Sequence, residues 1–179
     1  MISENYKQQL AWMHQRKMFA GRLNEYEDAF NIVTKHTPKS ILDYGCAHGN
    51  LVNKLKEDFP HIQVDGYDPA VEKYQQYPTQ SYDMMFCLDV MEHLELEYLA
   101  EIVQGMDKLI DRHAYMVIAC YPAQKKLPDG RNTHIIIKEP QWWLDMLTKH
   151  LDRCKIDDYV VHTLKNGHDE LRVTLKNER

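Results

Sequence analysis

The sequence predicts an α/β fold with a mostly parallel sheet that ends in an antiparallel hairpin. Short apolar runs alternate with segments of helical periodicity through the middle of the chain, and this alternation is typical of parallel βαβ units. A glycine-rich turn at residues 43–49 follows the first apolar run, and the acid Asp68 follows the second. Near the C-terminus, two β-rich runs flank Asn166-Gly167, a dipeptide that favours a tight hairpin.

The first 38 residues are predicted to form a helical segment ahead of the sheet. Apolar residues recur at helical spacing between residues 5 and 36, and Gly21 offers a break between two helices. Pro38 disfavours helix at the residue before it. We expect one domain over residues 1–179, with the helical segment at 1–38 and the core at 39–179. The segment either closes over a ligand site or supports the sheet, and the sequence favours neither.

The remaining elements follow from the apolar runs of the core. We expect strands at residues 40–44, 61–67, 82–88, 115–120, 155–164 and 169–175. We expect helices at residues 50–57, 96–110 and 140–151, the last of which begins with a proline that suits the first helical turn. Only fourteen residues separate Asp68 from Asp83, too few for a further helix and strand. The sequence therefore predicts a sheet that is trimmed at this place.

The turn at 43–49 and the acid at 68 predict a nucleoside-binding half-fold. The turn brings the backbone close to a ligand, and a carboxylate after the second strand accepts hydrogen bonds from two ribose hydroxyls. A phosphate-binding turn would read G-x-G-x-x-G, but here Asp43 stands at the strand end. An acid at that place repels a pyrophosphate and helps to hold a cationic amino-acid tail. The pattern therefore favours S-adenosylmethionine (SAM) over a dinucleotide.

Three motifs in this region resemble those of the class I SAM-dependent methyltransferases. Residues 41–49 resemble the first motif, with Ala47 where the middle glycine usually sits. Residues 66–70 are similar to the end of the second strand, and residues 82–94 to the fourth strand and its turn. The resemblance covers about residues 40–175, and residues 127–143 look like small stand-alone bacterial and phage members. A Rossmann-like domain that binds another nucleotide, or none, is the alternative.

The resemblance implies a Rossmann-like methyltransferase sheet with SAM as its cofactor. It assigns cofactor binding to Asp43, Gly45, Cys46, Ala47, Gly49, Asp68 and Leu88. The third strand of the family usually helps to frame the adenine ring. Because this chain is trimmed there, the adenine contacts stay open.

The segment Asp89-x-x-Glu92-His93 is the candidate catalytic element. Positions three and four residues apart share one face of a helical turn, so we expect these three side chains to converge. Methyl transfer to a hydroxyl requires alignment of the acceptor and removal of a proton. Since histidine titrates in the appropriate pH range, we predict His93 and Asp89 as catalytic residues.

A possible metal site follows from a further resemblance. Asp89, Glu92 and His93 with the later His134 resemble the ligands of small-RNA 2′-O-methyltransferases and ubiquinone-pathway O-methyltransferases. Those groups carry Glu-x-x-Glu-His and a later histidine as ligands of a divalent metal. The resemblance implies Mg²⁺, Mn²⁺, Fe²⁺ or Zn²⁺ on these four residues, and an acceptor with a vicinal diol. A metal-free pocket that the Glu-His pair merely shapes is the alternative.

Composition restricts the partners that the protein can take. No run of about eighteen apolar residues occurs, so we expect no membrane span. No signal peptide is recognised at the N-terminus, and four cysteines without metal-type spacing fit free thiols in the cytoplasm. The net charge of −5 does not favour nucleic acid as a partner.

The sequence supports three functional hypotheses. The first is an O-methyltransferase for a hydroxyl of a small molecule, sugar or nucleoside-like acceptor. The second is an RNA ribose 2′-O-methyltransferase, and the third is a SAM-binding partner protein without turnover. The oligomeric state stays open.

Overall fold

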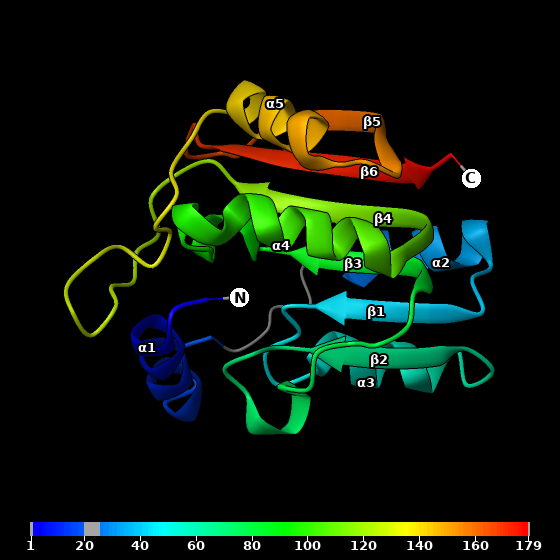
Figure 1. The fold of residues 1–179 in the computed structure, drawn as a ribbon, viewed down its shortest axis with the longest axis horizontal. Coiled ribbons are helices and arrows are strands. Elements are labelled where there is room, and N and C mark those ends of the chain that lie inside the picture. The colour runs from blue at the N-terminus through cyan, green and yellow to red at the C-terminus, as the bar shows by residue number, and fades with distance from the viewer. Residues whose placement is uncertain (1, 20–25, 179) are drawn as a thin grey trace.

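A six-stranded mixed sheet forms the centre of the computed structural model, which describes residues 2–19 and 26–178. The strand order is β2-β1-β3-β4-β6-β5. The first four strands of that order are parallel, and β6 runs antiparallel to both β4 and β5. The predicted parallel sheet with a terminal hairpin is therefore confirmed (Figure 1). The strands are β1 Ser40–Tyr44, β2 Gln63–Tyr67, β3 Tyr82–Leu88, β4 Ile110–Ala119, β5 Cys154–Thr163 and β6 Asp169–Asn177.

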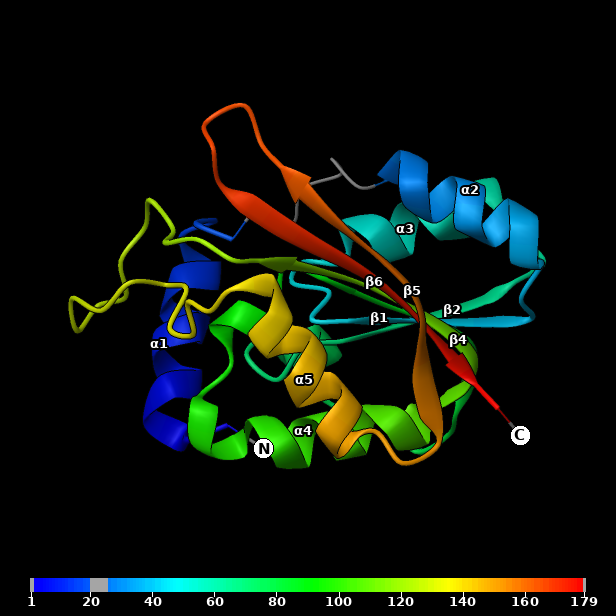
Figure 2. The same cartoon turned by 90° about the horizontal axis from the view of Figure 1, so that it is seen from above.

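Helices cover both faces of this sheet. They are α1 Glu4–Gln15, α2 Tyr26–His36, α3 Asn50–Asp58, α4 Leu96–Leu109 and α5 Pro140–His150, with 3₁₀ turns η1 Glu72–Tyr74 and η2 Met91–His93. Figure 2 shows α2 and α3 on one face and α4 and α5 on the other. Among the described residues, no helix has both the length and the hydropathy that a bilayer crossing requires.

Helix α4 shows how the apolar pattern determines packing. The residues at helical spacing from Leu99 to Met106 are buried, and they belong to the larger of the apolar clusters. Leu96 is 56% exposed because it is the first residue of the helix, a turn before the packed part. Ile110, which the prediction assigned to the helix, instead begins β4 and pairs with Tyr82.

The predicted trimming of the sheet is confirmed. Between β2 and β3 the described chain forms only the single turn η1 and loops, so β2 is an edge strand. The loop carries Tyr77 back across the sheet edge, where its ring packs at 5.2 Å from that of Tyr67. The Tyr77 hydroxyl also approaches α4, since a methyl group added at Gly105 would lie 2.9 Å from it. The loop thus fills part of the space that a further strand and helix would take.

The two helices of the N-terminal segment lie at different places in the fold (Figure 1). Helix α2 supports the sheet, since Ala29 and Val33 are buried in the apolar cluster beneath β1 and β3. Helix α1 lies instead beyond the end of the sheet to which the parallel strands point (Figure 1). The Tyr6 hydroxyl of α1 donates a hydrogen bond of 2.5 Å to the backbone carbonyl of His93. The predicted break at Gly21 lies outside the described residues.

The buried carboxylate of Asp107 gives a test of how the hairpin is attached. From α4 it accepts hydrogen bonds of 2.9–3.2 Å from the backbone N–H groups of residues 152–154, where β5 begins. We predict that Asp107→Ala lowers the free energy of unfolding by about 2–4 kcal/mol, because it leaves buried donors without partners. Denaturant unfolding measures the loss. Asp111→Ala, which removes a half-exposed partner of Arg153, should cost less than about 1 kcal/mol, and an equal loss in both variants would contradict the assignment.

Candidate active site

A cavity of about 1080 Å³ opens at the carboxyl ends of the parallel strands, the edge where open α/β sheets bind ligands. This volume lies at the upper limit for a single drug-sized ligand, so it offers room for a donor and an acceptor together. The predicted site residues that line it are Asp43, Gly45, Cys46, Ala47, Asp68, Leu88, Asp89, His93 and His134. Gly49 and Glu92 do not line it, because Gly49 faces Tyr74 and Glu92 is fully buried.

The glycine turn requires unusual backbone conformations at three positions. Gly45, Ala47 and Gly49 all have positive φ, of 83°, 47° and 77°. A β-carbon at Gly45 would lie 2.3 Å from a methyl group of Val90, and one at Gly49 would lie 2.1 Å from the Tyr74 hydroxyl. The turn therefore combines left-handed backbone with close approach, which only glycine tolerates at both ends. Ala47 adopts the same left-handed region with a side chain.

Asp68 is held in place by the backbone on both sides. Its Oδ2 accepts a hydrogen bond of 3.0 Å from the N–H of Ala47, and its Oδ1 accepts one of 2.9 Å from the N–H of Ala70. Each oxygen keeps a second lone pair. A fixed carboxylate that lines the cavity suits two neighbouring hydroxyls, as the sequence predicted for a ribose.

Asp43 is a buried acid that lines the cavity, and no ion pair of its carboxylate is found among the described residues. Burial, with a smaller contribution from the charge of Asp68, raises the pKa of Asp43 to about 7. No hydrogen bond from the described residues to this carboxyl group is found. Because a buried carboxylate is costly until a cation or donor compensates it, Asp43 is prepared for a positively charged ligand.

Three tyrosines that the sequence analysis missed line the cavity where the sheet is trimmed. The rings of Tyr44 and Tyr67 pack at 5.1 Å, and Tyr77 packs edge-on against Tyr67. Tyr44 and Tyr67 directly follow and precede the two acids of the site in the sequence, which is the only signal that could have found them. Their faces offer a stacking surface for a planar ring.

On the other side of the cavity, two imidazoles are oriented by backbone carbonyls. Nδ1 of His93 donates a hydrogen bond of 2.6 Å to the carbonyl of Thr133, and Nδ1 of His134 donates one of 2.6 Å to that of Tyr121. Since a carbonyl only accepts, the proton is on Nδ1 of each neutral ring. Both Nε2 atoms therefore carry a lone pair, which is the tautomer that metal-binding histidines use.

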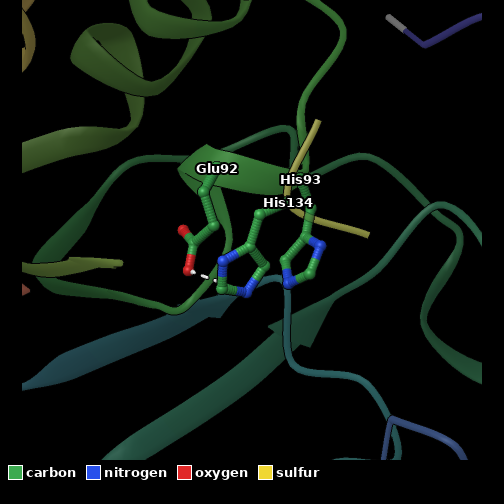
Figure 3. A group of neighbouring side chains, drawn as sticks. All are labelled: Glu92, His93 and His134. Carbon is green, nitrogen blue, oxygen red and sulfur yellow. Dashed lines mark ion pairs between the residues drawn. The ribbon is translucent and has the colours of Figure 1, made fainter. Parts of the chain in front are cut away.

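Glu92 completes a compact group with these two histidines. Its Oε1 accepts a hydrogen bond of 3.2 Å from the N–H of Ala119 and lies 4.0 Å from Nε2 of His134. Its Oε2 is buried and has no hydrogen-bond partner in the part of the chain that the structure describes. Each of Glu92, His93 and His134 offers one atom that could ligate a metal, and these three atoms lie within 4.8 Å of one another (Figure 3). The sequence placed these three residues together correctly.

Burial keeps this group uncharged. It raises the pKa of Glu92 well above its ordinary value, and the charge of Asp89 raises it further. Burial also lowers the pKa of His93 to about 3, with His134 as the second cause, and it lowers the pKa of His134. An imidazole with such a low pKa is a weak proton acceptor near neutral pH. It remains a good ligand for a cation.

Asp89 does not join the group that the sequence predicted for it. The prediction assumed one helical turn over residues 89–93, but the short helix η2 begins only at Met91. Asp89 itself has a φ of 54°, a left-handed conformation that takes its side chain out of the i, i+3, i+4 arrangement. Its carboxylate lines the cavity and is absent from the set of converging ligand atoms.

Helix α1 brings further residues to the cavity that sequence reasoning missed. Tyr6, Leu10 and His14 line it, together with Phe19 just beyond the helix. The ring of Phe19 packs edge-on against that of His93, at 5.3 Å. No local pattern marks these residues, because their role depends on where the helix lies in the fold.

The comparisons with known proteins agree with this geometry. The profile of a family described as "Methyltransferase domain" matches residues 13–155. No curated protein matches the chain significantly.

Solved structures of methyltransferases share the fold at low sequence identity. A 1,6-didemethyltoxoflavin-N1-methyltransferase from Burkholderia thailandensis, with bound 1,6-didemethyltoxoflavin and S-adenosylhomocysteine (SAH), matches with a TM-score of 0.66 and 14% identity over 100% of this chain and 92% of that one. The N-methyltransferase NodS from Bradyrhizobium japonicum, in complex with SAH, matches with a TM-score of 0.65 and 15% identity. That match covers 97% of this chain and 100% of NodS. A candidate O-methyltransferase from Nostoc punctiforme matches with a TM-score of 0.62 and 10% identity. The match covers 92% of this chain but only 59% of that one.

Substitution of two glycines with positive φ can distinguish the cost of backbone strain from the cost of a steric clash. Gly49 meets Tyr74, whereas a β-carbon at Gly130 would have no atom within 4 Å. We predict that Gly49→Ala lowers the free energy of unfolding by about 2–4 kcal/mol, since strain and a clash add. Gly130→Ala should lose only the strain, about 1 kcal/mol. Denaturant unfolding of both variants checks the difference, and equal losses would mean that Tyr74 yields without cost.

Proposed function

This chain belongs to the methyltransferase domain family and is a class I SAM-dependent methyltransferase, and we propose that it methylates a hydroxyl of a small molecule, sugar or nucleoside-like acceptor. The observation that carries the proposal is the group of Glu92, His93 and His134, whose two histidines line the cavity. The proposed nucleoside-binding residues line the same cavity, so a donor and an acceptor could be held close together there.

The donor pose that we propose follows the polarity of the cavity. Asp68 binds the ribose hydroxyls, and Asp43 faces the cationic amino-acid end of SAM. The adenine then stacks near Tyr67 and Tyr77, in the space left by the missing strand. Two of the matched proteins carry SAH, which supports SAM as the methyl donor here.

Glu92, His93 and His134 fit a divalent cation, and we propose them as its ligands. Backbone carbonyls bind Nδ1 of each histidine, which leaves each Nε2 with a lone pair. The buried Oε2 of Glu92 has no hydrogen-bond partner among the described residues. The mixed carboxylate and imidazole set suits Mg²⁺, Mn²⁺, Fe²⁺ or Zn²⁺. A cation bound there would lower the pKa of an acceptor hydroxyl.

The chain's own residues then orient the acceptor and take its proton. His93 lies at the cavity wall, where Thr133 and Phe19 fix its ring, so it positions the acceptor oxygen. Because burial makes His93 a weak base, we propose the Asp89 carboxylate as the proton acceptor. Tyr6 and Phe19 cover this side of the cavity and limit the access of water.

Other properties of the protein are proposed on weaker grounds. We treat residues 1–179 as one catalytic unit, since α1 lies beside Asp68 and also donates a hydrogen bond to the backbone of His93. Four free thiols support a cytoplasmic location. The net charge of −5 favours a small molecule over RNA as the acceptor.

Methyl transfer to matched acceptors, with either two neighbouring hydroxyls or one, tests the proposed function. We predict that purified protein transfers label from methyl-labelled SAM to vicinal diols and much less to their mono-hydroxyl analogues. A chelator and Glu92→Gln should each lower kcat by about 10–100-fold, since both disturb the cation site. His61→Ala, on an exposed turn, serves as the control variant.

Elemental analysis of the same protein measures bound metal directly. Metal bound to the wild type and to His61→Ala but lost from Glu92→Gln supports the ligand set. Chelator-insensitive transfer to nitrogen acceptors alone would overturn the oxygen assignment, and transfer to RNA would favour a ribose methyltransferase. Tight SAM binding with no transfer to any acceptor would leave a binding protein without turnover.

The buried Asp43 predicts a pH dependence of SAM binding. Its pKa is about 7 in the free protein, and only its ionised form attracts the cationic donor. Affinity for SAM should therefore rise by about tenfold between pH 6 and pH 8, with release of a proton on binding. Calorimetry in buffers of different ionisation enthalpy measures both quantities. Asp43→Asn should bind SAM more weakly with a flat pH profile, and an unchanged slope would exclude Asp43 as the titrating group.

A further inference from the structure

We propose that His14 is a donor-binding residue, whose imidazole holds the same ribose hydroxyl of SAM that Asp68 holds. Nε2 of His14 lies 3.8 Å from Oδ2 of Asp68, and both side chains are about nine-tenths buried. Both residues line the cavity. The inference rests on the assignment of this cavity to SAM and extends it to a residue of helix α1.

The distance between the two side chains is that of groups that share a third partner. At 3.8 Å, Nε2 and Oδ2 are too far apart for a direct hydrogen bond. A hydroxyl oxygen placed between them could lie at about 2.8 Å from both Nε2 and Oδ2, which is hydrogen-bonding distance to each. The hydroxyl donates its hydrogen to the carboxylate and accepts one from the imidazole. A ribose hydroxyl can make both bonds at once.

The imidazole of His14 has hydrogen-bonding capacity that the described chain does not use. Nδ1 is buried without a partner, and no hydrogen bond from Nε2 to the described residues is found. Burial lowers the pKa of His14, although the charge of Asp68 opposes the effect. A neutral ring results, with one donor and one acceptor nitrogen. The proposed ribose hydroxyl would accept a hydrogen bond from Nε2, which is the nitrogen that lies beside Asp68.

Helix α1 is fixed to the donor half at this point. His48 lies in the glycine turn, and its Nε2 is 3.2 Å from the backbone carbonyl of His14. The same turn gives the Ala47 N–H to Asp68. His14, His48 and Asp68 are thus held in one closed set of contacts, so the position of the imidazole is defined before SAM arrives.

A purely structural role for His14 is the competing explanation. Its ring also packs against Phe19 at 5.2 Å and His48 at 5.5 Å, and removal of the ring would loosen α1. Affinity for SAH alone therefore does not separate the two roles. Ligands that lack one ribose hydroxyl do separate them, because a structural defect weakens every ligand by the same factor.

Calorimetric titration with SAH and its 2′-deoxy and 3′-deoxy analogues tests the inference. We predict that His14→Ala binds SAH about 3–10-fold more weakly than the wild type, the value of one neutral hydrogen bond. For one of the two deoxy analogues, the wild type and His14→Ala should bind equally. His14→Gln, which keeps a donor near the same place, should recover part of the affinity for SAH.

Tyr6→Phe is the matched comparison for a loosened helix. It removes the bond from α1 to the His93 carbonyl and should weaken all three ligands by one common factor, if it weakens them at all. The inference is overturned if His14→Ala shows that common pattern, or if it binds SAH like the wild type. In either case a wild type that binds SAH, with binding lost in Asp68→Ala, leaves the donor site and the proposed reaction standing.

Discussion

The carboxylate of Asp68 is the constraint on which the rest of the site depends. Backbone N–H groups of Ala47 and Ala70 hold its two oxygens, and His14 of α1 lies beside it. Ala47, whose N–H makes the first of these bonds, has a left-handed backbone conformation. One side chain thus joins the first strand, the second strand and the N-terminal helix. The donor site is consequently formed before the ligand binds, which lowers the entropy lost on binding.

Features that depend on neighbours in the sequence were predictable, and features that depend on tertiary position were not. Strands β1 and β3 have the predicted bounds, because a short apolar run between turn residues determines each of them. Asp89 was misplaced, since the spacing of residues 89–93 suits a helix but the backbone turns left-handed first. The contacts of α1 join residues far apart in the chain, and no periodicity in the helix reveals them.

Trimming the sheet changes the cavity as well as its edge. Loss of a strand and helix after β2 would leave one face of β1 and β2 open to water. The loop with Tyr77 covers part of that face, and aromatic rings replace the backbone that would otherwise frame the adenine. A short loop fills less space than a strand and a helix, and the cavity extends along α4 as far as Leu109. The large cavity and the small number of elements after β2 therefore have the same cause.

The distribution of charge around the cavity suits the chemistry of a sulfonium donor. Transfer of the methyl group disperses positive charge, so an acid placed beside the sulfur would stabilise the ground state more than the transition state. The acids Asp43 and Asp68 lie beside the glycine turn, where we propose that they bind the amino-acid tail and the ribose. Burial holds His93 neutral across the cavity. Binding energy from the two ends of SAM can then be used to align the methyl group.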